Sequence, residues 1–235
     1  MNEAEFDRYA DAYYSQHARN ISLSGEDPEF FSEYKIVDVR RRLTGYDLGA
    51  DRILDFGAGI GNSIPYFRRH FPLSELHCAD ASQRSLAIAA ERFPGPEYAL
   101  VVREGECLDL PDGYFDVCFS ACVFHHIPHD QHRFWLRELL RVTRPGGMLF
   151  IFEHNPLNPL TVHAVNTCPF DANARLVTAR KLATTTRAAG WQNPQYEHRI
   201  FFPHALALLR PLERLLGRIP LGAQYMLFAR RELRG

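Results

Sequence analysis

Three glycines at alternate positions follow an aspartate in the stretch ILDFGAGIGNS, residues 53–63. Gly57 and Gly59 allow a tight backbone turn and let a ligand approach the main chain without a Cβ in the way. Dinucleotide-binding loops use similar glycines, but Asn62 stands where their third glycine would fall. The carboxylate of Asp55 would also repel a pyrophosphate and attract a cationic or amine-bearing ligand. The stretch therefore predicts a site for a positively charged ligand.

A second polar cluster is FHHIPHDQH, residues 124–132, which holds four histidines close to Cys122. Histidine can take up a proton near neutral pH and so can serve as a general base. A metal site is conceivable, but the spacing matches no common zinc pattern, and we predict none. We expect His129 to begin a helix, while His125 and His126 could be either catalytic or structural.

A third polar cluster is FEHNPLNP, residues 152–159, in which Glu153 and His154 should end a strand and face the same cavity. Glu153 could alternatively tie down the neighbouring loops. The segment Asn155–Val177 that follows has no clear period, and long aperiodic segments in compact domains are usually binding loops or lids. We expect it to face the ligand of this protein, the alternative being a surface loop without ligand contacts.

Strand and helix patterns alternate through the middle of the chain. Strands are predicted at 52–56, 75–80, 98–103, 115–121 and 147–153, with helices near 61–70, 83–93 and 130–143, the last ending at the stop signal RPGG. Two helices precede them, at 3–18 and at 27–43. A helix at 178–190, a strand at 196–202, a helix at 204–217 and a strand at 223–231 follow. The alternation predicts an α/β fold with a parallel sheet covered by helices on both faces.

Length, charge and cysteine content limit the class of protein. The 235 residues suit one large domain, and a net charge of −1 gives no reason to expect a nucleic-acid partner. Five cysteines, an odd number, suit reduced thiols, with Cys118 and Cys122 as buried small hydrophobes. The polar start is no signal peptide, and no apolar run is long enough to span a bilayer. We expect a soluble cytoplasmic protein; its oligomeric state stays open.

The basic C-terminal end contains FFPHALALLRPLERLLGRIPLG, residues 201–222. Such a segment could touch a membrane or a lipid-linked substrate. A helix packed between the last two strands is the interpretation that we favour here.

Five stretches in order resemble the class I S-adenosylmethionine-dependent methyltransferases of the small-molecule branch: FDRYADAYY (6–14), LDFGAGIGN (54–62), LHCADAS (76–82), REGECLDLPDGYFDVCFSACVFHHI (103–127) and LRELLRVTRPGGMLFIFE (136–153). The resemblance implies a seven-stranded, mostly parallel, doubly wound Rossmann-like sheet with a reversed last strand. It implies an N-terminal helical cap at 1–48 and a methyltransferase domain at 49–235 with a loop insertion at 155–178.

The resemblance also implies how the cofactor S-adenosyl-L-methionine would be held. Asp80 would bind the ribose hydroxyls, Asp55 would orient the methionyl ammonium, and Glu106 would accept from the adenine amino group beside the Cys107 backbone. The implied cofactor residues are Tyr13, Asp55, Gly57, Ala58, Gly59, Asn62, Asp80, Ala81, Glu106, Cys107 and Ala121.

By the same resemblance, the reaction is methyl transfer to a small-molecule acceptor, leaving S-adenosyl-L-homocysteine. The acceptor atom would be a hydroxyl oxygen, with nitrogen or carbon close behind, in a natural-product, sugar or lipid-linked intermediate. Catalytic candidates are His126, Glu153 and His154, and acceptor-contacting candidates are Tyr9, Tyr14, His125, Asn155 and Asn158. An enzyme that uses this cofactor for another reaction, such as a cyclisation, and a non-catalytic cofactor sensor remain the alternatives.

Overall fold

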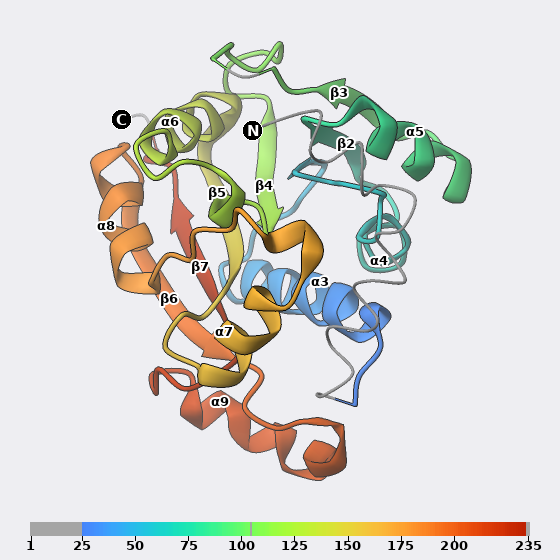
Figure 1. The fold of residues 1–235 in the computed structure, drawn as a ribbon. Helices are drawn as coiled ribbons and strands as arrows, with labels where there is room; N and C mark the ends of the chain where they lie inside the picture. Colours follow the sequence, from blue (N-terminus) through green and yellow to red (C-terminus); the bar gives the residue numbers. More distant parts are fainter. Residues whose placement is uncertain (1–24, 104, 234–235) are drawn as a thin grey trace.

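A computed structural model describes residues 25–103 and 105–233 (Figure 1). The N-terminal helix predicted at 3–18, with Tyr9, Tyr13 and Tyr14, lies outside the described residues. A seven-stranded sheet in the order β3-β2-β1-β4-β5-β7-β6 forms the centre of the molecule (Figure 1). Its strands are β1 Arg52–Phe56, β2 Glu75–Asp80, β3 Tyr98–Val101, β4 Phe115–Ala121, β5 Thr143–His154, β6 Gln192–Arg199 and β7 Gln224–Arg230.

The strand directions confirm the predicted mostly parallel sheet with a reversed last strand. β1 to β5 pair in parallel, whereas β7 lies antiparallel between β5 and β6. Because parallel strands all end at the same edge, the loops after β1, β2, β4 and β5 meet there.

Helices cover both faces of the sheet, as the alternation of elements predicts. They are α3 Pro28–Gly45, α4 Ile64–His70, α5 Gln83–Arg92, α6 His132–Val142, α7 Pro159–Asn166, α8 Ala179–Ala188 and α9 Glu213–Leu216, with 3-10 turns η2 Phe124–His126, η3 Pro169–Asp171 and η4 His204–Leu212. One apolar cluster joins α6 and α8 to the sheet, and another joins α3, α4 and α5 to its other face. Ile53 and Leu54 enter different clusters, as the two-residue period of a strand requires.

Local signals place α3 correctly. Asp27 is its N-cap and accepts from the Phe30 N–H at 2.7 Å, and Pro28 stands in the first helical position. Ile36 and Val39 on this helix are fully buried in the same cluster as Ile53 of β1. This helix therefore packs on the sheet itself, while the predicted domain boundary at residue 48 stays a prediction.

Two segments differ from the predictions made from their pattern. β5 begins at Thr143, so the RPGG signal lies inside a strand, next to an irregularity in the pairing with β4 that accommodates a proline without a donor N–H. The segment 155–177, expected to be aperiodic, contains α7, which Asn158 caps by accepting from the Thr161 N–H. Among the described residues no helix is long and apolar enough to cross a membrane.

Candidate active site

The glycines of the loop after β1 differ in what lies next to them. Gly57, Gly59 and Gly61 all have positive φ, which favours glycine. A Cβ on Gly57 would lie 2.1 Å from Val123 Cγ2, whereas a Cβ on Gly59 would meet nothing within 4 Å. Gly57 therefore makes room for the protein's own Val123, and Gly59 is the position at which a ligand can reach the backbone.

Asp80, at the end of β2, connects this loop to the next one. Its carboxylate accepts from the backbone N–H of Gly59 and of Ser82, each at 2.8 Å. The side chain is half-buried, and a carboxylate has about four acceptor positions. The geometry leaves the predicted role toward ribose hydroxyls chemically sound.

Asp55 lies in β1 directly before the glycines and is 1% exposed. Its Oδ2 atom has no hydrogen-bond partner among the described residues. Burial, followed by the charge of Asp80, raises its pKa to about 8, against a smaller opposing effect of Lys35. An orphaned buried carboxylate beside an open glycine backbone suits an ammonium group, so these residues fit the methionyl part of the implied cofactor.

The remaining cofactor candidates lie along the same sheet edge with different surroundings. Asn62 accepts from Arg92 of α5 at 2.8 Å, and Ala58 and Ala81 are buried. Glu106 and Cys107 follow β3 and are exposed. These placements leave their assignment to the cofactor a prediction.

Glu153, at the end of β5, holds the turn that follows β4. One carboxylate oxygen accepts from the N–H of Val123 at 2.9 Å and of Phe124 at 2.7 Å. The other lies 2.6 Å from Nδ1 of His125, and both side chains are 1% exposed. With both oxygens engaged by η2, Glu153 ties this turn down, the alternative that the sequence left open.

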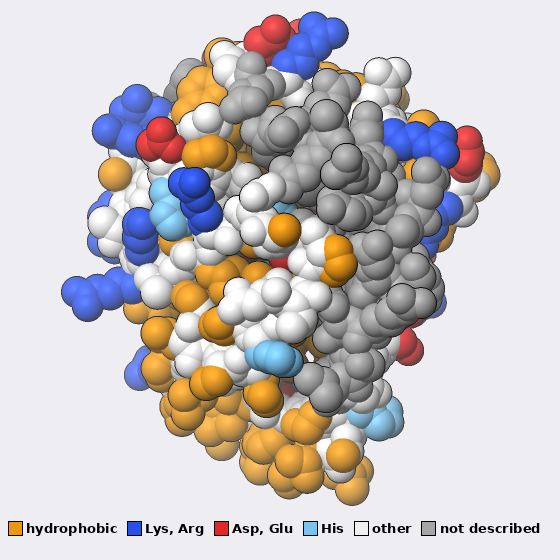
Figure 2. Space-filling model, viewed as in Figure 1, with side chains coloured by type: hydrophobic (Ala, Val, Ile, Leu, Met, Phe, Trp, Pro, Cys, Tyr) orange, Lys and Arg blue, Asp and Glu red, His pale blue; other side chains and the backbone are white. Residues whose placement is uncertain are grey.

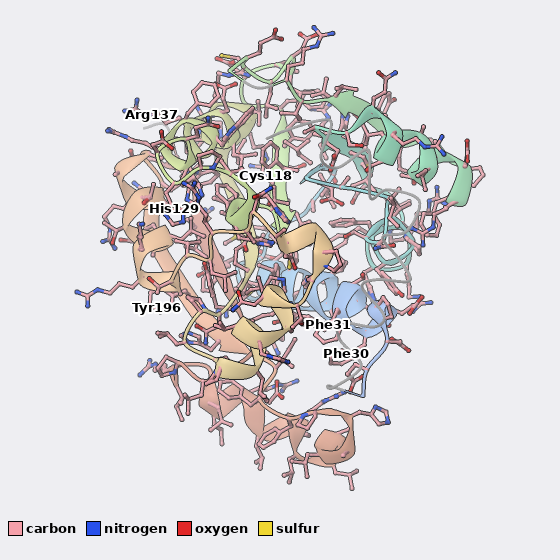
Figure 3. The ribbon with its side chains drawn as sticks, viewed as in Figure 1. Phe30, Phe31, Cys118, His129, Arg137 and Tyr196 are labelled. Atoms are coloured by element: carbon pink, nitrogen blue, oxygen red, sulfur yellow. The ribbon has the colours of Figure 1, made fainter. Side chains whose placement is uncertain are left out.

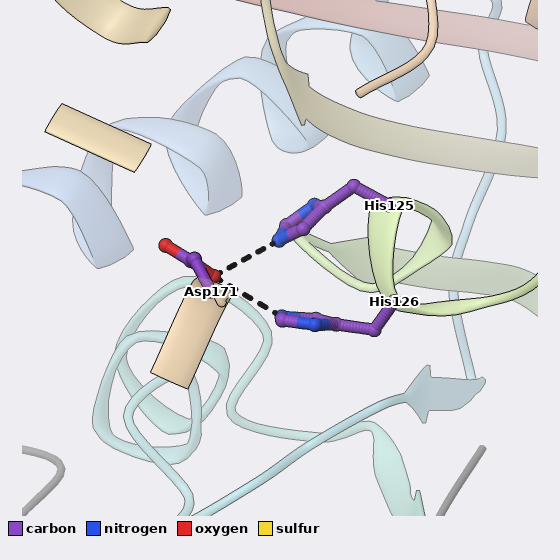
Figure 4. A group of neighbouring side chains, drawn as sticks. All are labelled: His125, His126 and Asp171. Atoms are coloured by element: carbon purple, nitrogen blue, oxygen red, sulfur yellow. Dashed lines mark ion pairs between the residues drawn. The ribbon is translucent and has the colours of Figure 1, made fainter. Parts of the chain in front are cut away.

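Asp171 of η3 brings the two adjacent histidines to one point (Figure 4). Nε2 of His125 lies 3.5 Å from Asp171 Oδ1, and Nε2 of His126 lies 3.4 Å from the same oxygen. Burial would lower the pKa of His125, but Glu153 and Asp171 outweigh it and hold that pKa well above its usual value. Burial and then the neighbouring His125 lower the pKa of His126 to about 3. The pair is thus a charged His125 beside a neutral His126.

His125, His126 and Asp171 are also the group of side chains, within the described ranges, whose ligand atoms all lie within 4.8 Å and could share a metal ion. Each ring nitrogen of His125 faces a carboxylate, however, which suits an imidazolium with no lone pair to offer. We therefore assign this group to hydrogen bonding, and the prediction that the protein holds no metal stays a prediction.

A sulfur–nitrogen cluster lies next to this network, and the sequence did not reveal it. Cys122 has φ +59°, a strained value for a residue with a side chain, and its Sγ lies 3.8 Å from Nζ of the buried Lys35. Burial would raise the pKa of Cys122, but Lys35 and His154 lower it to about 7. Burial lowers the pKa of His154, and Cys122 more than reverses this, so that the pKa is raised. Cys118, in contrast, is a core thiol within β4 (Figure 3).

Cys122 was expected to be a buried small hydrophobe like Cys118, since four residues separate the two in an apolar run. That expectation fails because β4 ends at Ala121, and the next residue turns into the left-handed region toward α3. The missed partners are Lys35 and Asp171. The only sequence signal for Lys35 was its place between apolar helix residues, and nothing local linked Asp171 to the histidines.

Asn155 and Asn158, predicted to contact the acceptor, use their amides within the protein. Nδ2 of Asn155 donates to the carbonyls of Pro220 and Gly222 at 3.0 and 2.8 Å, and Nδ2 of Asn158 donates to Leu221 O at 2.7 Å. They attach the start of α7 to the loop before β7. These bonds do not support the predicted contact of Asn155 and Asn158 with the acceptor, which stays a prediction.

A cavity of about 680 Å³ lies between α3 and the segment that includes β6 and α9. Its lining is charged, but Arg42 and Arg199 pair with Glu197, and Arg199 also pairs with Asp38. Tyr34 lines it and donates to Gln224, whose Nε2 lies 4.0 Å from Cys122 Sγ. The cavity is therefore connected to Cys122 through Tyr34 and Gln224, and its lining does not include the glycine loop.

Comparison with known proteins agrees with this geometry. Residues 54–151 match the model of a methyltransferase domain. The ubiquinone/menaquinone biosynthesis C-methyltransferase UbiE of Ectopseudomonas mendocina is 29% identical over 174 residues, which cover 70% of this chain and 65% of that protein. The aligned part is thus just under two thirds of that relative.

Two solved structures share the fold. A methyltransferase of Thermotoga maritima described as a possible histamine N-methyltransferase has a TM-score of 0.67 at 17% identity, over 98% of this chain and 99% of that one. The [4+2]-cyclase SpnF has a TM-score of 0.57 at 21% identity, over 79% of this chain and 77% of its own. The sheet order and the glycine loop define a Rossmann-like α/β fold. By sequence, residues 54–151 of this chain are similar to methyltransferase domains, and by fold the chain is similar to S-adenosylmethionine-dependent methyltransferases of known structure.

The two glycines should respond differently to a methyl group. Gly57→Ala should lower the free energy of unfolding by roughly 2–5 kcal/mol, since it adds left-handed strain to the contact with Val123. Gly59→Ala should cost only about 1 kcal/mol, because its Cβ enters open space. Urea denaturation of both variants measures the difference, and equal losses would contradict it.

Asn155→Ala should also lower stability, by roughly 1–3 kcal/mol, because it leaves the carbonyls of Pro220 and Gly222 without their donor, the latter in a buried position. Asn166→Ala, which replaces an exposed asparagine at the end of the nearby helix α7, is the matched control and should change little. Thermal denaturation compares them. A stable Asn155→Ala variant with impaired use of an acceptor would instead restore the prediction made from the sequence.

Proposed function

We propose that this protein binds S-adenosyl-L-methionine at the glycine loop and transfers its methyl group to a small-molecule acceptor. The observation that carries the proposal is the buried oxygen of Asp55, which has no hydrogen-bond partner among the described residues, just before the loop that contains the open backbone of Gly59. A dinucleotide would bring its pyrophosphate to this carboxylate, which opposes that ligand. A cofactor with an amino-acid end brings an ammonium group instead.

When bound, the cofactor supplies a methyl group already activated by a sulfonium. The task of the chain is then to align the acceptor with that methyl and to keep water away. The ends of β4 and β5 are placed for this task, since in open α/β sheets ligands bind beyond the carboxyl ends of the strands. The segment that follows β4 contains η2, and the segment that follows β5 contains α7 and η3.

We propose His126 as the group that takes the proton of a hydroxyl acceptor. Its side chain is 12% exposed, whereas those of His125 and Glu153 are 1% exposed and engaged with each other. Burial, and then the charged His125, keep His126 neutral, so that its unprotonated ring nitrogen can accept a proton. Glu153 and His125 would act as positioning residues. The alternative general base is the pair of His154 and Cys122.

Two alternatives remain on chemical grounds. A neutral amine acceptor would need less help from a base, whereas a carbon acceptor must lose a proton as a hydroxyl does. A reaction other than methyl transfer also fits the same fold, as the solved cyclase shows for its own case. Turnover of cofactor labelled in its methyl group, offered with panels of hydroxylated, amine and lipid-linked metabolites, separates these possibilities. Labelled product identifies the acceptor class, and cofactor binding without transfer to any panel would support a sensor or another reaction.

Cofactor affinity should depend on the ionisation of Asp55. Its pKa of about 8 means that the carboxyl is mostly protonated below pH 8, whereas an ammonium prefers the ionised form. Affinity for S-adenosyl-L-methionine should therefore rise between pH 6 and 7.5, by up to about tenfold per pH unit, with release of a proton. Calorimetry in buffers of different ionisation enthalpy measures both effects.

Asp55→Asn should remove this pH dependence and weaken binding at pH 7.5, while the exposed Asp51→Asn should behave like the native chain. Binding of NAD, or cofactor affinity that is indifferent to Asp55, would overturn the assignment of the site.

His126→Ala should lower turnover of a hydroxyl acceptor by about two to four decades with little change in cofactor affinity. Because the pKa of His126 lies near 3, the native profile of kcat/KM for the acceptor, measured at saturating cofactor, should be flat from pH 5 upward. A limb near pH 7 would assign the base to Cys122 and His154 instead. His129→Ala is the matched control, since this ring contacts Lys181 and the Arg175 carbonyl at the surface (Figure 3). Turnover should survive treatment with a chelator.

A further inference from the structure

The segment between β6 and β7 exposes large apolar side chains. No residue of η4 or α9 is buried, although a packed helix was predicted there. Leu208 is 96% exposed and Leu215 80% exposed. We call the exposed set the leucine surface; it consists of Leu206, Leu208, Leu209, Leu212, Leu215, Ile219 and Leu221. It forms the lower end of the molecule in Figure 2, and contiguous exposed apolar surface of this kind marks an interaction site.

The exposure belongs to the folded state, because the segment is firmly attached. The Glu213 carboxylate accepts from the backbone N–H groups of Ile200, Phe201 and Phe202. The His198 N–H donates to the Gly217 carbonyl at 2.7 Å. The backbone is therefore held against β6 while the leucine side chains point to solvent.

The exposed charged side chains within residues 204–221 have one sign. Glu213 is the only acid in residues 204–221, and its carboxylate faces the backbone of 200–202. Arg214 and Arg218 are exposed among the leucines. Apolar side chains next to exposed arginines complement a lipid bilayer, whose acyl region accepts the former and whose anionic headgroups attract the latter. None of the seven leucine-surface residues lines the neighbouring cavity.

The leucine surface continues to the active-site edge of the sheet. Leu157 and Leu160, at the start of α7, are exposed, the latter by 74%. The Asn158 amide bonds this helix start to Leu221, a member of the leucine surface. The same segment follows directly from the end of β5, where Glu153 and His154 lie.

We propose that the leucine surface docks this protein on an anionic lipid bilayer, with the acceptor side of the site facing the membrane. The acceptor is then an amphipathic molecule whose apolar chain stays in the bilayer. That statement about the acceptor rests on the proposed function, whereas the docking itself does not.

Flotation of the full chain with lipid vesicles tests the docking. The chain should bind phosphatidylcholine vesicles that contain phosphatidylglycerol, and bind pure phosphatidylcholine more weakly. The double variant Leu208→Ser, Leu215→Ser should partition about tenfold less or lower. Leu73→Ser, 97% exposed in the turn before β2, is its matched control and should bind like the native chain.

A second variant tests the charge. Arg214→Glu with Arg218→Glu should abolish the preference for anionic vesicles. Arg137→Glu should keep it, because Arg137 projects from α6 at the opposite end of the molecule (Figure 3). Calorimetry of cofactor binding on every variant shows that the fold is intact and tests the proposed function separately from vesicle binding.

Three results would overturn the proposal. The first is a native chain that does not float with anionic vesicles. The second is a serine double variant that floats as well as the native chain. The third is a native chain that forms a dimer without lipid, while the serine double variant is a monomer. The last result, from sedimentation velocity, would show that a second copy covers the leucine surface. Absent cofactor binding in a chain that still floats would reject the methyltransferase proposal and leave the docking in place.

Discussion

A single buried carboxylate, that of Glu153, sets the geometry of the site. An ionised group without water must be compensated by donors and charge, and here two backbone N–H groups and the His125 ring supply them. Those bonds fix the turn after β4, and with it Val123, whose side chain fills the space beside Gly57. The glycine loop thereby takes its shape from a residue at the end of a different strand. The Gly59 N–H then reaches Asp80, so four strand ends are coupled through one network.

The electrostatic arrangement is uneven across this edge of the sheet. On one side Asp55 holds an oxygen for which the described chain provides no partner, and burial raises its pKa. On the other side each ring nitrogen of His125 faces a carboxylate, that of Glu153 or that of Asp171. An unsatisfied group in a buried position is a common sign of a ligand site, whereas a satisfied network holds a neighbouring group in place. On the proposed function, cofactor binding and acceptor alignment would fall to different parts of one edge.

The same loops link the chemistry to the outer surface. The amides of Asn155 and Asn158 join the polypeptide that leaves β5 to the polypeptide that enters β7. A shift of the leucine surface would therefore be transmitted to the start of α7. This connection gives a physical route by which the surface on which the protein rests could influence access to the site.

The sequence alone determined the order of the elements and most of the cofactor loop. Two-residue and 3.6-residue periods, the cap at Asp27 and the alternate glycines are local features, which is why β1, β2, β4 and α3 were placed well. Only the tertiary structure decided that Gly57 faces Val123, that Asp171 meets two histidines, that Cys122 meets Lys35, and that the leucines of η4 and α9 stay exposed. Each of these is a contact between residues distant in the chain, or the lack of a packing partner for a local pattern. An apolar helical pattern states that side chains could be buried, but whether another surface covers them depends on how the whole chain folds.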